Sequence, residues 1–249
     1  MGAPSSDCPD PFEHAKLELS LKMQQPVHDT ASSPNLGVAV PLKKHQRISM
    51  TPGAGDHVYL VTSGVVLVEG KLPEQRRQVL EILYEGDIYP TQDAPEFLAT
   101  VLVASTASEL RRLKQQAAEA LSGNQPEFAR RIAAASAVRG TRRTIHLASI
   151  SRPSGEERLA DFLVEMGLHL GRPVVSGRMF DLPLSRDDIA DYLALNPDTL
   201  SRLFSRLKAK RMIAISQGRA TVADWEALCR LSPLSGPLVE LSKRCRSIE

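Results

Sequence analysis

Residues 197–208 distribute their side chains as an amphipathic helix does. At about 3.6 residues per turn, the spacing separates them onto two opposite faces. One face is apolar: Leu200, Leu203, Phe204 and Leu207. The other face is polar: Asp198, Ser201, Arg202 and Ser205, with Arg206 and Lys208 on its flanks. The pattern predicts a helix that buries one side and presents hydrogen-bonding and basic groups on the other.

A shorter helix is expected immediately before it. Ser185 and Asp188 have the spacing of a capping box, in which a hydroxyl and a carboxylate satisfy free backbone amides at a helix start. Asn196 followed by Pro197 is a second start signal, because Asn caps free amides and Pro is tolerated at the first helical position. Two short helices joined by a tight turn indicate a helix-turn-helix, whose second helix enters the DNA major groove.

A β-hairpin is predicted directly after these helices. Residues 212–216 and 220–223 are apolar or β-prone runs, and residues 217–219 between them are typical of a turn. This is the pattern of a wing with a basic tip, Arg219. The segment 199–223 contains six basic residues and no acidic one, although the formal net charge of the whole chain is only +2. This local concentration of basic charge favours DNA phosphate as the partner.

The sequence from about residue 38 to 105 alternates short Val, Ile, Leu and Tyr runs with Gly and Pro breaks, which predicts antiparallel strands in a β-roll. A helical stretch then begins at Pro126 and extends to about residue 150, before a break at 152–155. Either a partner helix packs on this helix or the helix packs on its own domain. Five residues with 4-3-4-3 spacing form the expected seam: Ala134, Val138, Thr141, Ile145 and Ala148.

The rest of the chain narrows its class. Residues 1–35 hold five of the seventeen prolines and predict a mobile leader. The longest apolar run, 97–104, is far shorter than the ~20 residues of a membrane helix, and no secretory signal is evident. Cys8, Cys229 and Cys245 are too few and too scattered for a disulfide framework. We therefore expect a cytoplasmic protein with no membrane partner.

At its motifs the chain resembles the Crp/Fnr superfamily of bacterial transcription regulators, and it looks most like the Fnr and FixK branch. The segments that carry the resemblance are Leu182–Leu193, Asp198–Arg202, Gly155–Leu163, Gly55–Val68, Arg76–Leu80 and Gly86–Asp87. The resemblance implies an α+β fold with an N-terminal antiparallel β-roll of the cyclic-nucleotide-binding kind, a long dimerisation helix and a C-terminal winged helix-turn-helix. The implied divisions are a leader at 1–35, the roll at 36–120, the dimerisation helix at 121–151, and the DNA-binding domain with its tail at 152–249.

The resemblance implies a homodimeric regulator that binds a palindrome of TTG-type half-sites in double-stranded DNA, with RNA polymerase as a further partner. Arg202 can present two parallel donors to guanine, and Ser201 can contact a thymine methyl group or a phosphate. Asp198 stands where the Fnr and FixK pattern usually has Glu. It either accepts a hydrogen bond from cytosine N4 or only complements the charge of the helix start. Further DNA contacts are expected from Ser205, Arg206, Lys208 and Arg219.

No cofactor and no metal are expected. A cyclic nucleotide needs a cation for its phosphate, yet no Lys or Arg lies between Arg77 and Arg111. Cys8 is the only cysteine before Cys229, too few for the four-cysteine iron–sulfur cluster of oxygen-sensing relatives. The alternative is a ligand- or haem-gated regulator of the same superfamily. Its candidate haem ligands are His14, His28, His45 and His57.

Catalytic chemistry is not expected, because the chain has no nucleophile elbow, P-loop, dinucleotide fingerprint or metal-spaced His and Cys set. Residues 225–229 predict a short helix behind the wing. Cys229 in that helix is either a small buried hydrophobe or, if exposed with a lowered pKa, a redox site. His146 and His169 are expected to be structural.

Overall fold

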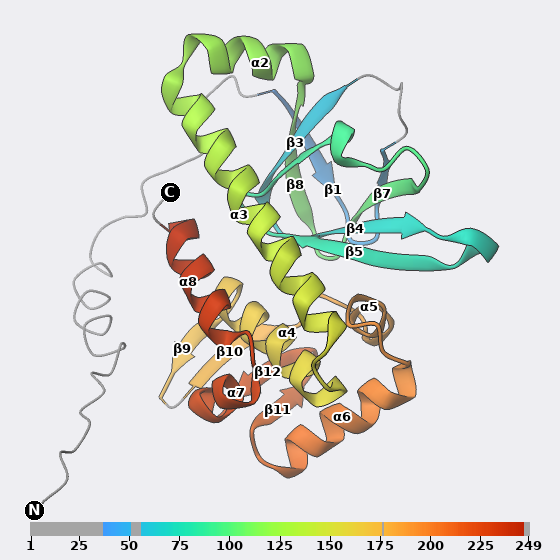
Figure 1. Ribbon diagram of the computed structural model, residues 1–249, viewed down its shortest axis with the longest axis vertical. Coiled ribbons are helices and arrows are strands. Elements are labelled where there is room, and N and C mark those ends of the chain that lie inside the picture. The colour runs from blue at the N-terminus through green and yellow to red at the C-terminus, as the bar shows by residue number, and fades with distance from the viewer. Residues whose placement is uncertain (1–36, 51–55, 176, 247–249) are drawn as a thin grey trace, which may run out of the picture. The chain divides into compact units, whose positions relative to one another are not determined.

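The computed structural model describes residues 37–50, 56–175 and 177–246. Residues 37–249 form one compact unit, with a β-rich part, two long helices, and then shorter helices around a third sheet (Figure 1). Several sequence predictions lie outside the described residues: the leader at 1–35 with Cys8, His14 and His28.

The β-rich part consists of two four-stranded antiparallel sheets, in the orders β1-β8-β3-β6 and β2-β7-β4-β5. Alternate side chains from both sheets, among them Tyr59, Leu83 and Leu102, meet in one apolar core. Gly64 turns the chain between β3 and β4 at φ +87°, and a Cβ there would collide with Ser108, so glycine is required. The strands are β1 Val38–Leu42, β2 Arg47–Ser49, β3 His57–Ser63, β4 Val66–Lys71, β5 Arg77–Leu83, β6 Ile88–Pro90, β7 Ala99–Ala104 and β8 Ser108–Lys114.

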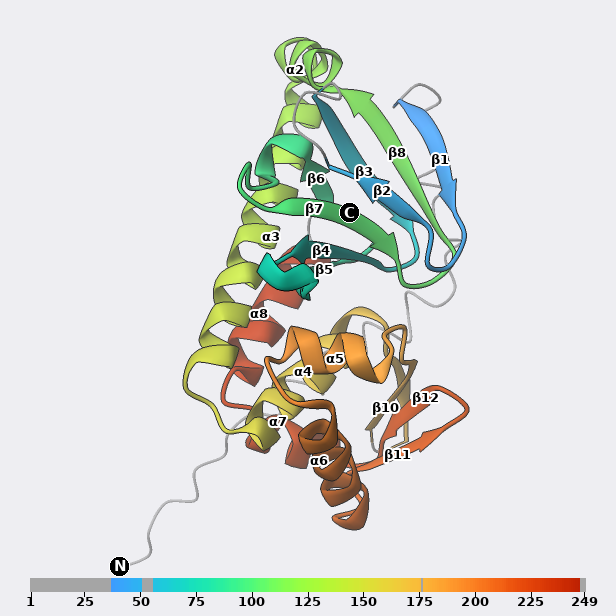
Figure 2. The same ribbon diagram turned by 90° about the vertical axis from the view of Figure 1, so that its right-hand side faces the viewer.

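Three helices lead out of the roll: α2 Gln115–Asn124, α3 Pro126–Ser151 and α4 Gly155–His169. Helix α3 begins with Pro at its first position, as the sequence predicted, and runs along one side of the molecule (Figure 2). Helix α4 begins with a capping box between Ser154 and Glu157.

The C-terminal elements form a winged helix-turn-helix around the sheet β11-β12-β10-β9. Their core is continuous with the roll, because Leu67, Val79 and Tyr84 of the roll join Phe162 and Phe204 in one hydrophobic cluster. The elements are β9 Arg172–Val174, β10 Gly177–Asp181, α5 Arg186–Tyr192, α6 Pro197–Ala209, β11 Ile213–Ser216, β12 Arg219–Val222, α7 Trp225–Leu231 and α8 Ser235–Arg246.

The predicted α+β fold is therefore confirmed, from the antiparallel roll through the long helix to the winged helix-turn-helix. Helix α8, which the sequence analysis did not predict, buries Leu238 and Leu241 and packs on α3 and α4. Among the described residues, no helix combines the length and the apolar character that crossing a membrane requires.

Candidate nucleic-acid interface

Both predicted helix starts in the helix-turn-helix are confirmed. The Ser185 hydroxyl accepts a hydrogen bond from the Asp188 amide at 3.1 Å, and the Asp188 carboxylate accepts one from the Ser185 amide at 3.1 Å. The Asn196 side chain accepts from the Asp198 amide at 2.9 Å. Ala194 adopts φ +51° in the turn between α5 and α6. These caps set where each helix begins, and so which residues of α6 face outward.

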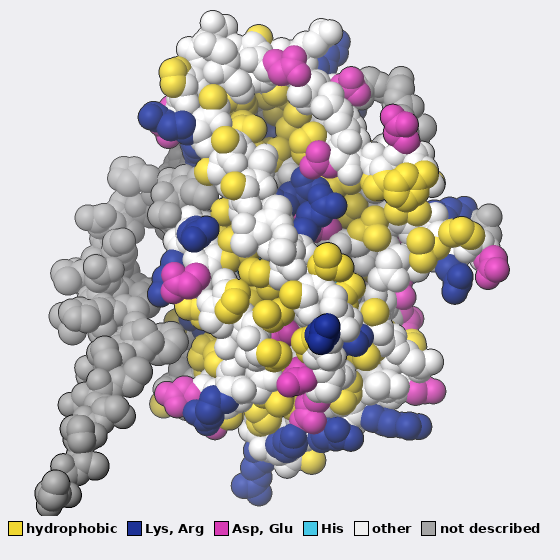
Figure 3. Space-filling model, in the orientation of Figure 1, with side chains coloured by type: hydrophobic (Ala, Val, Ile, Leu, Met, Phe, Trp, Pro, Cys, Tyr) yellow, Lys and Arg dark blue, Asp and Glu magenta, His cyan; other side chains and the backbone are white. Residues whose placement is uncertain are grey.

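Helix α6 has the two faces that its sequence predicts. Its four apolar residues are buried under the helix, with Leu200 and Leu207 wholly enclosed. All the proposed DNA contacts on α6 are exposed: Asp198, Ser201, Arg202, Ser205, Arg206 and Lys208. Lys and Arg side chains gather at the edge of the molecule that α6 forms (Figure 3). A hydrogen-bonding face flanked by cations suits the major groove, where phosphates line both sides of the base edges.

The predicted wing is a two-stranded hairpin that pairs Ser216 with Arg219. Gln217 and Gly218 adopt φ +50° and +78°, the positive values that a tight hairpin turn of the I′ type requires. Arg219 stands exposed at the end of this hairpin. The wing therefore presents its cation beside the recognition helix.

Three cations of this surface are already paired with carboxylates. Arg206 Nη1 lies 3.3 Å from Glu156 Oε2, Lys210 also pairs with Glu156, and Arg219 Nε lies 2.7 Å from Asp181 Oδ1. Sequence reasoning missed Glu156 and Asp181, because they lie 50 and 38 residues away from Arg206 and Arg219. No periodic pattern links residues so far apart. Arg202 and Lys208, by contrast, form no ion pair with any residue that the structure describes.

The structure divides the five residues of the expected helix seam. Val138 is 8% exposed and Ile145 is partly buried, both against the chain's own core, as the alternative interpretation of this helix expected. Thr141 and Ala148 are exposed, and Ala134 is partly buried. A neighbouring stripe, one residue earlier at each position, is exposed throughout: Ala133, Ala137, Gly140, Thr144 and Leu147.

Charged side chains turn α3 toward the roll. Arg139 contacts Glu81 at 2.7 Å, and Arg142 contacts Asp87 at 2.5 Å, both from buried positions. Sequence reasoning treats arginine as a surface residue, so it could not anticipate this rotation. The orientation of the seam is therefore decided by partners from the roll.

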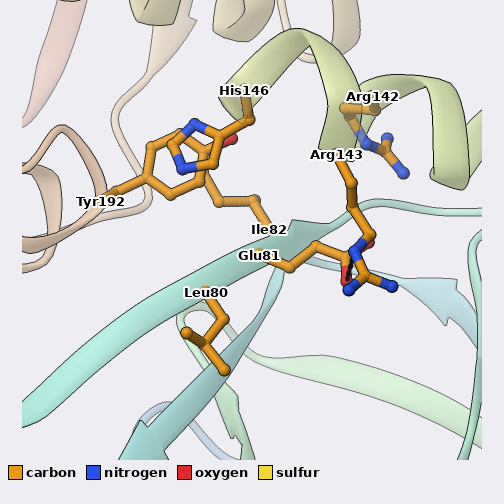
Figure 4. A pocket seen from close by; sticks show the side chains of 7 residues that line it. All are labelled: Leu80, Glu81, Ile82, Arg142, Arg143, His146 and Tyr192. Atoms are coloured by element: carbon orange, nitrogen blue, oxygen red, sulfur yellow. Dashed lines mark ion pairs between the residues drawn. The ribbon is translucent and has the colours of Figure 1, made fainter. Parts of the chain in front are cut away.

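A small pocket lies where β5, α3 and α5 meet, and its volume is about 180 Å³ (Figure 4). The His146 ring stacks on Tyr192 across it, with 3.8 Å between ring centroids. Burial lowers the pKa of His146 to about 4, and burial together with the positive charge of Arg142 lowers the pKa of His169 to about 3. Both histidines are therefore neutral at pH 7. The pocket is lined by Leu80, Glu81, Ile82, Arg142, Arg143, His146 and Tyr192.

The remaining candidate residues lie apart from α6. His45 is exposed in the turn after β1, and His57 begins β3 next to Tyr59. Among the described residues, no group of three or more His, Cys, Asp or Glu side chains could hold a metal ion. Cys229 lies partly buried in α7, where burial raises the pKa of its thiol to about 11. That shift reduces the thiolate needed for redox chemistry and favours the packing role of Cys229.

Comparisons with known proteins agree with this geometry. A Crp-like helix-turn-helix domain model matches residues 157–231. The nitrogen fixation regulation protein FixK of Rhizobium meliloti (strain 1021) is 31% identical over 166 residues, which span 66% of this chain and 72% of that protein. FixK of Azorhizobium caulinodans is 30% identical over 200 residues, 79% of each chain. The solved structure of FixK2 from Bradyrhizobium japonicum has a TM-score of 0.68 and 25% identity, covering 80% of this chain and 98% of that one.

These relatives regulate transcription and are not enzymes, in agreement with the lack of catalytic motifs noted above. Likeness in sequence and in fold extends from the roll to the winged helix-turn-helix, so it is not confined to one motif. The chain belongs to the Crp/Fnr family of DNA-binding transcription regulators, near its FixK branch.

Proposed function

We propose that this chain is a cytoplasmic homodimer that binds a palindrome of TTG-type half-sites and regulates transcription without a bound cofactor, with RNA polymerase as a further partner. The observation that carries the proposal is the exposed face of α6, where Arg202 is unpaired among the described residues and central. A guanidinium in that position can donate two parallel hydrogen bonds to guanine O6 and N7.

The exposed stripe on α3 supports the homodimer. Its members Ala133, Ala137, Gly140 and Thr144 are small, so two copies of the helix could approach closely, and Leu147 adds an apolar side chain that is 62% exposed. A two-fold dimer through this stripe places two α6 helices for successive major grooves. Half-sites about 34 Å apart would then match the two helices.

The packing of the roll supports the cofactor-free state. Its interior is occupied by the chain's own large side chains, among them Tyr89, Leu67 and Leu102. The pocket of about 180 Å³ at the junction is smaller than the roughly 300–1,000 Å³ of small-molecule sites. Its lining pairs Arg143 with Glu81 at 4.0 Å, so this cation already has a carboxylate partner.

Fluorescence anisotropy with labelled duplexes tests the proposal. We expect the purified protein, with no nucleotide added, to prefer a TTG palindrome over a random duplex of the same length. Equal affinity for both duplexes would contradict the base readout. A tenfold gain in affinity on adding cyclic AMP, equivalent to about 1.4 kcal/mol, would contradict the cofactor-free state.

A further inference from the structure

Two carboxylates from outside the helix-turn-helix reach the cations of the proposed DNA surface. Glu156 is in the first turn of α4, and Asp181 is the last residue of β10. Neither belongs to the recognition helix or the wing, yet each pairs with basic side chains there.

Glu156 holds two cations at the C-terminal end of α6. Its carboxylate lies 3.3 Å from Arg206 Nη1 and also pairs with Lys210. The Glu156 side chain is only 15% exposed, whereas those of Arg206 and Lys210 are 59% and 48% exposed. The carboxylate therefore sits beneath its two partners, which remain open to solvent and to an incoming phosphate.

Asp181 plays the same part under the wing. Its Oδ1 atom accepts a hydrogen bond from Arg219 Nε at 2.7 Å, across two paired strands. The Asp181 and Arg219 side chains are both about half exposed or more. Ion pairs as exposed as this contribute little to folding, because water screens them and two long side chains must be held in one geometry.

The cations nearer the middle of α6 are treated differently. Arg202 and Lys208 have no acidic partner among the described residues, although both are exposed on the same helix. The surface thus divides into unpaired cations at the centre of α6 and paired cations at its C-terminal end and on the wing. That division matters for DNA, because phosphate contacts set overall affinity and base contacts set sequence preference.

We propose that Glu156 and Asp181 are intramolecular counterions that weaken the grip of Arg206, Lys210 and Arg219 on the DNA backbone. A phosphate must compete with each carboxylate, and each carboxylate repels the phosphates that approach its partners. The effect applies to any duplex, so it lowers affinity without changing sequence preference. More of the binding is then left to Arg202. This inference rests on the proposed DNA surface.

The masking is constant at neutral pH. Hydrogen bonds from Lys210 and Arg206 lower the pKa of Glu156, and the hydrogen bond from Arg219 lowers the pKa of Asp181. Both carboxylates therefore stay ionised well below pH 7. The device adjusts affinity through ionic strength, since salt weakens the competition between carboxylate and phosphate for one cation.

The test uses the full chain with Glu156→Gln, Asp181→Asn and the double variant. Affinity for a TTG palindrome and for a random duplex is measured between 50 and 200 mM salt. We expect each single variant to bind both duplexes several-fold tighter at 50 mM salt, by the same factor. That advantage should shrink by about 3.5-fold at 200 mM, which follows from a slope of about −0.9 for each added phosphate contact.

Matched controls separate local masking from net charge. Glu226→Gln and Glu240→Gln each remove one carboxylate from an exposed ion pair on α7 or α8, with Arg230 and Lys243 respectively. These controls should change affinity less than twofold. A gain equal to that of Glu156→Gln would mean that only the net charge matters, and would overturn the proposal.

Weaker binding by Glu156→Gln would also overturn the proposal, because it would make Glu156 a positioning residue for Arg206 and Lys210. Urea unfolding checks that each variant is folded. Asp181→Asn, at an exposed strand end, tests the idea independently if Glu156→Gln does not fold. A wild-type protein without preference for the palindrome contradicts the proposed function alone, because masking is measured on the random duplex.

Discussion

Single residues on α6 differ in their surroundings although they share one exposed face. Arg202 has neither an ion pair nor a burial constraint among the described residues, whereas Arg206 is tied to Glu156. Asp198 lies in the first helical turn, where its backbone amide is capped by Asn196 and its carboxylate is free to face DNA. Base readout is therefore expected from Arg202 first, with Asp198 as the residue whose role is open to two outcomes.

Arg202→Ala should abolish the preference for guanine in the half-site. We expect a loss of about 1–3 kcal/mol per half-site, because two parallel hydrogen bonds to one base are removed. Weak, salt-sensitive binding should remain. Anisotropy with the palindrome and a random duplex measures this, with Arg230→Ala on α7 as a control that removes one exposed cation elsewhere. An equal loss on both duplexes would reduce Arg202 to a phosphate contact.

Asp198→Glu should change which base is preferred at one symmetric position of the site. The longer carboxylate reaches about 1.5 Å further and can accept directly from cytosine N4. Selection of binding sites from a random DNA pool, run with both proteins, measures the preference. Identical selected motifs would mean that Asp198 only complements the helix start, an interaction of a few tenths to about 1 kcal/mol that Glu supplies equally well.

At the scale of elements, helix α3 shows how one residue of offset changes a surface. Its 4-3-4-3 repeat is present in two neighbouring registers, because small residues occupy both of them. The buried salt bridges of Arg139 and Arg142 turn the register with Val138 and Ile145 toward the roll. The exposed register, which ends at Leu147, is left for a partner.

Ala137→Glu combined with Leu147→Glu should split the dimer while leaving the protomer folded. Both side chains are exposed, so the new charges meet each other only where two copies of α3 pack. Sedimentation velocity measures the mass, and urea unfolding measures the stability. An unchanged dimer would place the interface on another element.

Val138→Glu is the matched contrast to this pair. Its side chain is 8% exposed within its own chain, and a carboxylate there has no partner and must leave water. We expect the free energy of unfolding to fall by several kcal/mol, detected as a lower urea midpoint. Unchanged stability would show that α3 is turned the other way in solution.

At the scale of the whole molecule, polar contacts tie the roll to the helix-turn-helix. Arg77 of β5 pairs with Glu69 in the roll at 2.9 Å and with Asp191 of α5 at 3.0 Å. Deeper in the junction, Tyr84 of the roll donates a hydrogen bond to Glu165 of α4 at 3.0 Å. The orientation of α6 therefore depends on the roll as well as on its own domain.

The two buried histidines of this junction predict a loss of stability in mild acid. His146 and His169 have pKa values of about 4 and about 3 in the folded chain, below the ordinary value of 6.5, so the unfolded chain binds more protons between these limits. Stability is complete above pH 6.5 and falls as the pH drops. From pH 7 to 5 each histidine should cost at most about 2 kcal/mol.

Replacement of these histidines isolates the effect. The pKa of Glu165 is raised by burial, so its protonation opposes the loss, and only the difference between proteins is informative. His169→Phe should retain a ring against Tyr84, where the two ring centroids lie 4.0 Å apart, and remove the proton. Urea unfolding at pH 7 and pH 5 should show a smaller drop for the variant. An equal drop would assign the acid sensitivity to other groups.

The local structure of this protein was predictable from its sequence because its signals are local. Ser185 with Asp188 and Asn196 with Pro197 start α5 and α6 through contacts two or three residues apart. The apolar spacing along α6 selects its buried face, and the turn at Gly218 closes the wing. Each of these depends on hydrogen bonds or periodicity within one or two turns of chain.

Only the tertiary structure decided which face of α3 is exposed and which cations of the DNA surface are paired. Those outcomes depend on Glu81, Asp87, Glu156 and Asp181, which lie 38 to 58 residues from their basic partners. Charge attraction acts through space and leaves no period in the sequence. Side chains therefore find such partners only after the chain has folded.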